Sequence, residues 1–203
     1  MTKTANNKKE AMHIAINEDI TSPTYPLASL LPAHALYSDP PWGPGNLRYW
    51  RTMNKQNVMV NWPAFLVSFS TICAQVQGPC WVEMGVRWEG ELQQALEQQG
   101  LSVRHRWDVL YRGGSKLLPN VLLLALRKGD ELSFTPGDPG DRRGAALPLW
   151  ALSHHLTTDQ TVIDPCCGKG YTAMAAKKIG ATFHGSELNP DRLAVTRGRL
   201  GLA

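Results

Sequence analysis

The chain has 203 residues, which suits one domain, and its 43% apolar content is ordinary for a globular protein and excludes wholesale disorder. No apolar run approaches the roughly 18 residues that a membrane-spanning helix needs. Residues 1–10 are polar and lack the apolar centre of a signal peptide, so a cytoplasmic protein is expected. The net charge of +4 is compatible with nucleic-acid binding without requiring it.

Residues 1–11 resemble a loose N-terminal tail, and a single domain is expected over 12–203. Apolar periodicity and turn residues predict the elements of its first part, 12–129. These are a strand at 12–16, a short helix at 27–31, a strand at 35–37, a long surface loop at 43–57, a helix at 62–76, a strand at 80–86, a helix at 89–99, and strands at 101–111 and 120–127 joined by a hairpin-like turn at 112–116.

In the last part of the chain, the sequence pattern predicts alternating helices and strands. A stretch rich in proline, glycine and charge at 130–146 indicates a linker. After it the pattern predicts a helix at 147–156, a strand at 161–164, a glycine turn, a helix at 172–179, a strand at 182–187 and a helix at 191–200. Strands that alternate with helices are typical of an open α/β sheet with helices on both faces.

The four cysteines predict neither a disulfide framework nor a metal site. Cys73, Cys80, Cys166 and Cys167 form no paired C-x-x-C spacing. We therefore expect free, buried thiols in a reducing compartment and no bound metal.

The first candidate site is the segment Asp39-Pro40-Pro41-Trp42, which ends the short apolar strand at 35–37. Two prolines stop the strand, and Pro40 biases Asp39 towards an extended conformation. A carboxylate, proline carbonyls and an aromatic ring form a receptor for a planar ring that carries an amino group. A proline turn with Trp42 packed in the core explains the same residues, and these residues alone favour that simpler interpretation.

The second candidate site is a buried strand that runs into the glycine turn at Gly168 and Gly170 and then into a helix. Such a turn lets a ligand approach the backbone. Glu187 ends the next strand about 20 residues later, where an acid usually binds a ribose diol. Asp164, just before the glycines, would repel a pyrophosphate and suits a cationic amine such as that of S-adenosylmethionine. Binding of NAD stays open because Ala173 is tolerated at the third glycine position of that motif.

Together, and in this order, these motifs resemble those of the amino-methyltransferases that act on nucleic-acid bases. The resemblance is to the circularly permuted, beta-class type, in which D-P-P-[YFW] precedes the cofactor-binding segment. Asp39-Pro40-Pro41-Trp42 matches the catalytic tetrapeptide, and the segment 162–170 is similar to D-P-F-x-G-S-G. The segment 185–190 is similar to G-x-E-x-N-P, and Asn17-Glu18-Asp19 is similar to the family's N-G-D acid. The resemblance covers about residues 12–203.

The resemblance implies a Rossmann-like methyltransferase fold with a mixed, mostly parallel seven-stranded sheet, in a cytoplasmic protein encoded by a bacterium or a phage. It also implies S-adenosylmethionine as cofactor, with the helix at 147–156 helping to bind its methionine part. The implied cofactor-binding residues are Asn17, Asp19, Ile20, Asp39, Asp164, Pro165, Cys166, Gly168, Gly170, Glu187, Leu188 and Asn189.

Three features depart from the family pattern. Cys166 replaces an aromatic residue, and Lys169 replaces a serine. The interval 130–146 is too short for the target-recognition domain that DNA-reading members carry there. The resemblance therefore implies a catalytic half at 12–129, a linker at 130–146 and a cofactor-binding half at 147–203. Such an enzyme would either be nonspecific or obtain target recognition from a homodimer or a protein partner.

The implied reaction is methyl transfer to the N6 amino group of adenine in DNA. Asp39 and the Pro40 carbonyl would accept the amino N–H bonds, and Trp42 would stack on the base. Aspartate at position 39 favours adenine over the N4 group of cytosine. An RNA adenine methyltransferase remains an alternative, because D-P-P-W also occurs in messenger-RNA adenine methylases. A non-catalytic subunit of the same fold is a further alternative, which the intact motifs disfavour.

Basic and aromatic residues near the first site are candidates for nucleic-acid contact. The expected loop at 43–57 supplies most of them, although a solvated charged loop would have the same composition. The glycine turn at 112–116 supplies two more. The candidates are Arg48, Tyr49, Trp50, Arg51, Lys55, Arg112 and Lys116.

Overall fold

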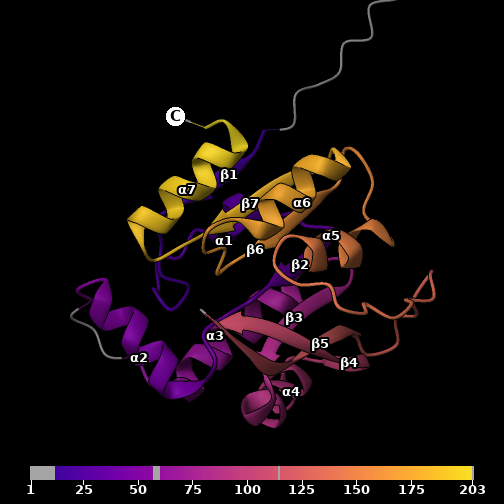
Figure 1. The fold of residues 1–203 in the computed structure, drawn as a ribbon, viewed down its shortest axis with the longest axis horizontal. Helices are drawn as coiled ribbons and strands as arrows, with labels where there is room; N and C mark the ends of the chain where they lie inside the picture. The colour runs from indigo at the N-terminus through magenta and orange to yellow at the C-terminus, as the bar shows by residue number, and fades with distance from the viewer. Residues whose placement is uncertain (1–11, 57–59, 114, 203) are drawn as a thin grey trace, which may run out of the picture.

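The computed structural model describes residues 12–56, 60–113 and 115–202. Within these residues one sheet has seven strands in the order β1-β7-β6-β2-β3-β5-β4 (Figure 1). The pairs from β1 to β3 are parallel, and the pairs of β5 with β3 and β4 are antiparallel. The expected α/β class with a mixed, mostly parallel sheet is confirmed.

The strands are β1 (Ile14–Ile16), β2 (Ala35–Ser38), β3 (Cys80–Gly85), β4 (Leu101–Gly113), β5 (Lys116–Arg127), β6 (Thr161–Asp164) and β7 (Thr182–Ser186). The helices are α1 (Leu27–Leu30), α2 (Gly43–Met53), α3 (Trp62–Gln75), α4 (Glu89–Gln98), α5 (Ala146–Ser153), α6 (Tyr171–Ile179) and α7 (Pro190–Leu200), with a 3-10 turn at Val86–Trp88. In the described part, no helix is long and apolar enough to cross a membrane.

Helices cover both faces of the sheet, as Figure 1 shows. Successive strand residues point to opposite faces, so Leu36 of β2 packs in one apolar cluster while Ala35 and Tyr37 pack in the other. The first cluster contains side chains of α1, α2, α3 and α4, and the second contains those of α5, α6 and α7. The central strands are therefore buried on both faces, which explains their continuous apolar sequences.

The prediction of a long surface loop at 43–57 is wrong over most of its length, because Gly43–Met53 forms helix α2. Pro44 lies in the first turn, where its fixed φ favours a helix and its missing N–H has no cost. Leu47 and Arg51, four residues apart, form the buried face of the helix. The turn-forming composition concealed this periodicity. Residues 57–59 lie outside the described residues.

The hairpin of β4 and β5 is longer than expected, because its strands extend through most of the predicted turn at 112–116. Residue 114 lies outside the described part. Pro119 lies within β5 but beyond the last pair with β3, Gly85 with Asn120, so it is not flanked by partners on both sides. The remaining predicted elements are present, with small shifts at their ends.

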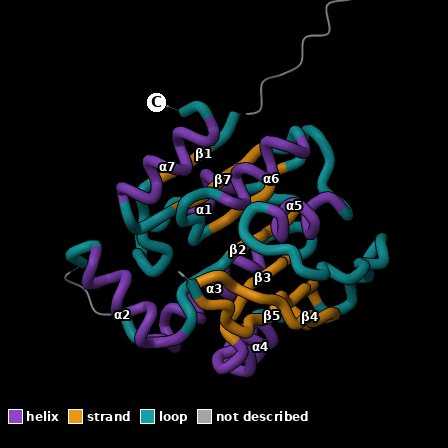
Figure 2. The backbone as a smooth tube through the Cα atoms, viewed as in Figure 1, coloured by secondary structure: helices purple, strands orange, loops and turns teal. Residues whose placement is uncertain are grey.

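The segment 130–145 forms no helix or strand and is drawn as a teal loop in Figure 2. It still packs on the sheet, because Leu132 and Phe134 contact the second apolar cluster. Phe134 stacks on His155 with 5.1 Å between ring centroids, and on the buried Trp81 with 6.3 Å. The segment is short, as expected, and its aromatic contacts attach it to the core.

Candidate active site

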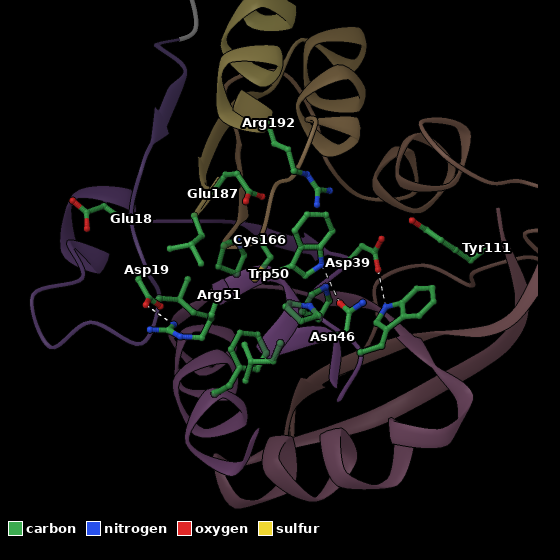
Figure 3. Close-up of a pocket in the computed structure, with 18 residues that line it drawn as sticks. Glu18, Asp19, Asp39, Asn46, Trp50, Arg51, Tyr111, Cys166, Glu187 and Arg192 are labelled. Carbon is green, nitrogen blue, oxygen red and sulfur yellow. Dashed lines mark hydrogen bonds and ion pairs between the residues drawn. The ribbon is translucent and has the colours of Figure 1, made fainter. Parts of the chain in front are cut away.

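A cavity lies at the carboxyl ends of the parallel strands, where open α/β sheets usually bind ligands (Figure 3). Asp39 follows β2, Cys166 follows β6 and Glu187 follows β7, so all three meet at this edge. The cavity together with the open solvent at its mouth occupies about 870 Å³.

The cavity brings together twelve of the expected site residues. These are Asp19, Ile20, Asp39, Pro40, Pro41, Trp42, Trp50, Arg51, Pro165, Cys166, Glu187 and Leu188. The sequence argument missed six further lining residues: Glu18 as a direct wall residue, Asn46, Leu47, Phe65, Tyr111 and Arg192. No residue of α5 is among those that line the cavity.

Asp39 lies at the wall of this cavity with much of its hydrogen-bonding capacity unused. Within the described part, its carboxylate accepts one hydrogen bond, from Trp42 Nε1 to Oδ1 at 2.8 Å. The Trp42 ring lies edge-on to Tyr111, with 4.6 Å between centroids. Burial and then the charge of Glu83 raise the pKa of Asp39 well above its usual range. Asp39 is thus a partly buried acceptor that faces the cavity.

Glu83 is a second acid beside Asp39 that sequence reasoning did not find. β2 and β3 are parallel with Ser38 opposite Val82, so the next residues, Asp39 and Glu83, are neighbours. The Tyr37 hydroxyl group donates a hydrogen bond to Glu83 Oε1 at 2.7 Å. Burial, and secondarily the charge of Asp164, raises the pKa of Glu83 to about 7. The strand register was the missing information, since the two acids are far apart in sequence.

Asp164 lies beneath the glycine turn instead of facing the cavity, where the sequence argument places it. It is 3% exposed. Its Oδ1 accepts hydrogen bonds from Ser38 Oγ at 2.8 Å and from the Cys166 backbone N–H at 3.1 Å. Its Oδ2 accepts a hydrogen bond from Thr172 Oγ1 at 2.6 Å. Burial raises its pKa to about 6. Asp164 therefore links β2, the turn and α6.

The two glycines of the turn have a left-handed backbone conformation and lie close to side chains of α7. Gly168 and Gly170 have φ of +54° and +80°, in the left-handed region. A Cβ at Gly168 would lie 2.6 Å from Arg192 Nη2, and one at Gly170 would lie 2.7 Å from Thr196 Oγ1. Neither glycine lines the cavity. Their small size lets α7 approach the turn, which places Arg192 at the cavity.

Glu187 lines the cavity in a fixed orientation. Its Oε2 accepts a hydrogen bond from the Gly168 N–H at 2.7 Å, and its Oε1 accepts one from the Asn189 N–H at 2.8 Å. Each oxygen keeps capacity for another donor, such as a hydroxyl group. Asn17 supports this strand end, because its Nδ2 donates to the carbonyls of Glu187 and Leu188.

Asn189 has a structural role at the same strand end. Its Oδ1 accepts a hydrogen bond from the Arg192 N–H and so caps α7, whose first turn contains Pro190. Its Nδ2 donates to Asn54 Oδ1 at 2.6 Å, which joins α7 to the end of α2. Asn17 and Asn189 are therefore placed around the cavity but not in its wall.

Arg51 is buried, which corrects its expected place on a nucleic-acid-binding surface. It is 3% exposed, and its guanidinium pairs with Asp19 at 2.6 Å (Figure 3). Asp19 also accepts hydrogen bonds from Thr21, through the backbone N–H at 2.9 Å and the hydroxyl at 2.7 Å. The acid attracts the arginine inward, and together they form one wall of the cavity.

Trp50 and Arg192 meet across the cavity from α2 and α7 (Figure 3). The guanidinium carbon lies 4.4 Å from the centroid of the indole ring, a cation–π contact. The indole N–H donates to Asn46 Oδ1 at 3.1 Å. Among the described residues, Nε of Arg192 is buried without a hydrogen-bond partner. In the sequence, Arg192 could have been found as a cavity residue from its position in the first turn of the helix that follows Glu187.

The other expected nucleic-acid contacts lie on the surface. Arg48, Tyr49 and Lys55 are exposed on α2 or just after it, and Arg112 and Lys116 are exposed on β4 and β5. None of these five lines the cavity. In the described residues there is no group of three or more His, Cys, Asp or Glu that could hold a metal ion.

Solved structures show which fold this is, although no protein-family model and no curated protein matches the chain. M1.HpyAVI in complex with SAM matches with a TM-score of 0.70 and 18% identity, over 93% of this chain and 100% of that chain. TTHA0409 of Thermus thermophilus, a putative DNA modification methylase complexed with S-adenosyl-L-methionine, matches with 0.64 and 16%, over 94% and 93%. PvuII DNA methyltransferase, cytosine-N4-specific, matches with 0.65 and 12%, over 95% and 89%. The chain therefore has the Rossmann-like fold of these DNA methyltransferases.

Proposed function

We propose that this protein transfers a methyl group from S-adenosylmethionine to the exocyclic N6 amino group of adenine in DNA. The observation that carries the proposal is the shared cavity: the D-P-P-W acceptor Asp39 and the strand-end acid Glu187 line one space. Residues far apart in sequence thus line one cavity, which supports the proposal. The fold shared with SAM-bound DNA methylase structures supports the choice of cofactor and substrate class.

The residues around the cavity fit S-adenosylmethionine. Glu187 offers acceptor capacity for a ribose diol, and Leu188, Ile20 and Phe65 supply apolar wall for an adenine ring. The buried, unpartnered Nε of Arg192, among the residues that the structure describes, suits a ligand that carries a carboxylate. When bound, the cofactor supplies a methyl group on a positively charged sulfur.

Asp39 and the Pro40 carbonyl are suited to hold a base amino group. Such a nitrogen is a poor nucleophile because its lone pair is delocalised into the ring. Two acceptors that take its N–H hydrogens favour tetrahedral character and orient the lone pair. The nitrogen gains a methyl group and loses one proton, which Asp39 at the cavity wall would accept, with Glu83 as a second acid beside it.

Cytosine N4 is the second candidate target, because the cytosine-N4-specific PvuII enzyme matches this chain as well as TTHA0409 does. Both targets present an amino group on a planar ring, and Asp39 can accept from either. Aspartate at position 39 is the residue that favours adenine. None of these comparisons supports RNA as the substrate, and the test below therefore measures modified nucleosides in RNA as well as in DNA.

The short segment 130–145 leaves target recognition to other surfaces. We infer that a second copy of the chain or a protein partner helps select the DNA, with exposed Arg48, Tyr49 and Lys55 contacting the backbone.

The test is mass spectrometry of nucleosides from the DNA and RNA of cells that express the wild-type chain or Asp39→Ala. We expect N6-methyladenine in DNA with the wild type and background levels with the variant. Cofactor affinity, measured by calorimetry, should remain near wild type in Asp39→Ala and fall at least about tenfold in Glu187→Ala, the loss expected when a charge-assisted hydrogen bond is removed. Equal modification by wild type and Asp39→Ala would contradict the catalytic assignment, and N4-methylcytosine would replace the adenine proposal with the second candidate.

A further inference from the structure

The paired ends of β4 and β5 extend beyond the rest of the sheet. The last pair of β5 with β3 is Asn120 with Gly85, whereas β4 and β5 remain paired from Leu110 with Pro119 to Arg112 with Leu117. This two-stranded extension, residues 110–112 and 116–119, is called the ribbon below. In the described part no third strand pairs with it.

The ribbon exposes apolar side chains on both of its faces. Leu110 is 40% exposed and Leu117 is 47% exposed, and they lie on one face. Tyr111 is 37% exposed and Leu118 is 40% exposed, and they form a cross-strand pair on the other face. Single exposed apolar residues are normal, but four on one narrow projection indicate an interaction site.

The positive charge of the ribbon favours a nucleic acid as its partner. Arg112 and Lys116 are exposed on its two strands, and no aspartate or glutamate occurs between Val109 and Pro119. A projection with apolar sides and a positive end complements the stacked bases and phosphates of DNA.

The ribbon lies at the mouth of the cavity. Tyr111 lines the cavity and contacts the Trp42 ring. The ribbon also projects past Gly85, at the carboxyl end of β3, which is the same sheet edge at which β2 ends before Asp39. If a target base were held at Asp39, the gap that it leaves in the base stack would therefore lie next to the ribbon.

We propose that the ribbon enters the DNA duplex and that Leu117 fills the space left when the target base leaves the stack, while Leu118 on the opposite face supports Tyr111 at the cavity. This inference rests on the proposed function, since it concerns how that substrate reaches the cavity. A base inside a duplex must be extruded before its amino group can react, at a cost of a few kcal/mol. Apolar side chains that insert between base steps offset lost stacking in other DNA-bending proteins. A single-stranded substrate needs no such help.

The test compares Leu117→Ser/Leu118→Ser with wild type on one target sequence, supplied as duplex and as single strand. We expect kcat/KM to fall at least about tenfold on the duplex and less than about twofold on the single strand. A mismatch opposite the target should restore most of the loss, because the base is then extruded more easily. Val67→Ser is the matched control, since Val67 is 51% exposed on α3 and does not line the cavity.

Three outcomes would overturn the inference. The first is an equal loss on both substrates, which would indicate damage to the cavity. The second is unchanged activity on the duplex. The third is a change from dimer to monomer in sedimentation, which would make the ribbon a contact between two copies. If the wild type modifies neither DNA form, the proposed function itself fails. Fluorescence of 2-aminopurine at the target position then still tests insertion, because the double variant should lose any increase.

Discussion

Asp39 and Asp164 lie in similar sequence contexts but are used differently. Each lies at the end of a parallel strand, the strands β2 and β6 are neighbours, and each aspartate precedes a proline. Asp164 accepts three hydrogen bonds from the protein and is 3% exposed. Asp39 accepts one, from Trp42, within the described residues and lines the cavity.

The difference shows that the local motif does not determine the role of a strand-end acid. What matters is how much of its hydrogen-bonding capacity the protein itself uses. The hydroxyl groups of Ser38 and Thr172 donate hydrogen bonds to Asp164. Among the described residues, no hydroxyl group donates to Asp39 in the same way. An acid satisfied by the protein stabilises the fold, whereas a desolvated acid with unused acceptor capacity is available to a substrate.

The largest expected effect is the loss of the proposed methyl transfer in Asp39→Asn. An amide nitrogen would present a donor to the donor groups of the substrate, so kcat should fall at least about 10²–10³-fold. The free energy of unfolding should stay equal or rise, because the variant removes a charge that Glu83 repels. Single-turnover kinetics and urea unfolding measure the two effects. A stability loss that matches the activity loss would erase the distinction between the two aspartates.

The converse change, Asp164→Ala, should act first on stability. It leaves the buried hydroxyl groups of Ser38 and Thr172 without their acceptor, which costs on the order of 2–4 kcal/mol. Thermal or urea unfolding measures this loss, with Asp39→Ala as the matched control. If Asp164→Ala were as stable as wild type, the structural role assigned to this acid would be wrong.

The sequence alone predicted the fold class, most elements and the two motifs that meet at the cavity. These depend on local patterns: apolar periodicity, prolines at strand ends and glycines in turns. It did not predict Glu83, whose place beside Asp39 depends on strand register, or Arg192, which reaches the cavity because two glycines admit α7. Helix α2 was also missed, because its glycines and Pro44 indicate a turn when read without tertiary context.

The Glu83→Gln variant tests, through the pH dependence of kcat, whether Glu83 raises the pKa of Asp39. The carboxylate of Glu83 raises the pKa of Asp39, and the proposed methyl transfer would need Asp39 as an ionised acceptor. The variant should therefore move the acid limb of the kcat profile to lower pH, by about one pH unit, or 1.36 kcal/mol. An unchanged limb would mean that another group controls the ionisation.

The stability of the protein should also depend on Glu83. The pKa of this residue is about 7 in the folded protein, above its ordinary value near 4.3. The folded state thus binds the proton more tightly, and this stabilisation is fully present below about pH 4.3 and is lost as pH rises through about 7. Urea unfolding of wild type should show this decline between about pH 5 and 7.5, and Glu83→Gln should show less of it.

The smallest expected effect applies the same comparison to two arginines of α2. Arg51 is occupied by Asp19 and is 3% exposed, whereas Arg48 is exposed. We expect the exposed arginine, and not the one paired within the protein, to contact DNA. Arg48→Gln should therefore reduce the slope of log K for duplex DNA binding against log salt concentration by about 0.9, the value for one phosphate contact. Arg51→Gln should leave that slope unchanged and lower the melting temperature, because it leaves Asp19 in the cavity wall without its cation. Fluorescence anisotropy titrations at several salt concentrations measure the slope. A lower slope for Arg51→Gln alone would show that α2 rearranges on DNA and that the hydrogen bonds of the free protein do not identify its binding residues.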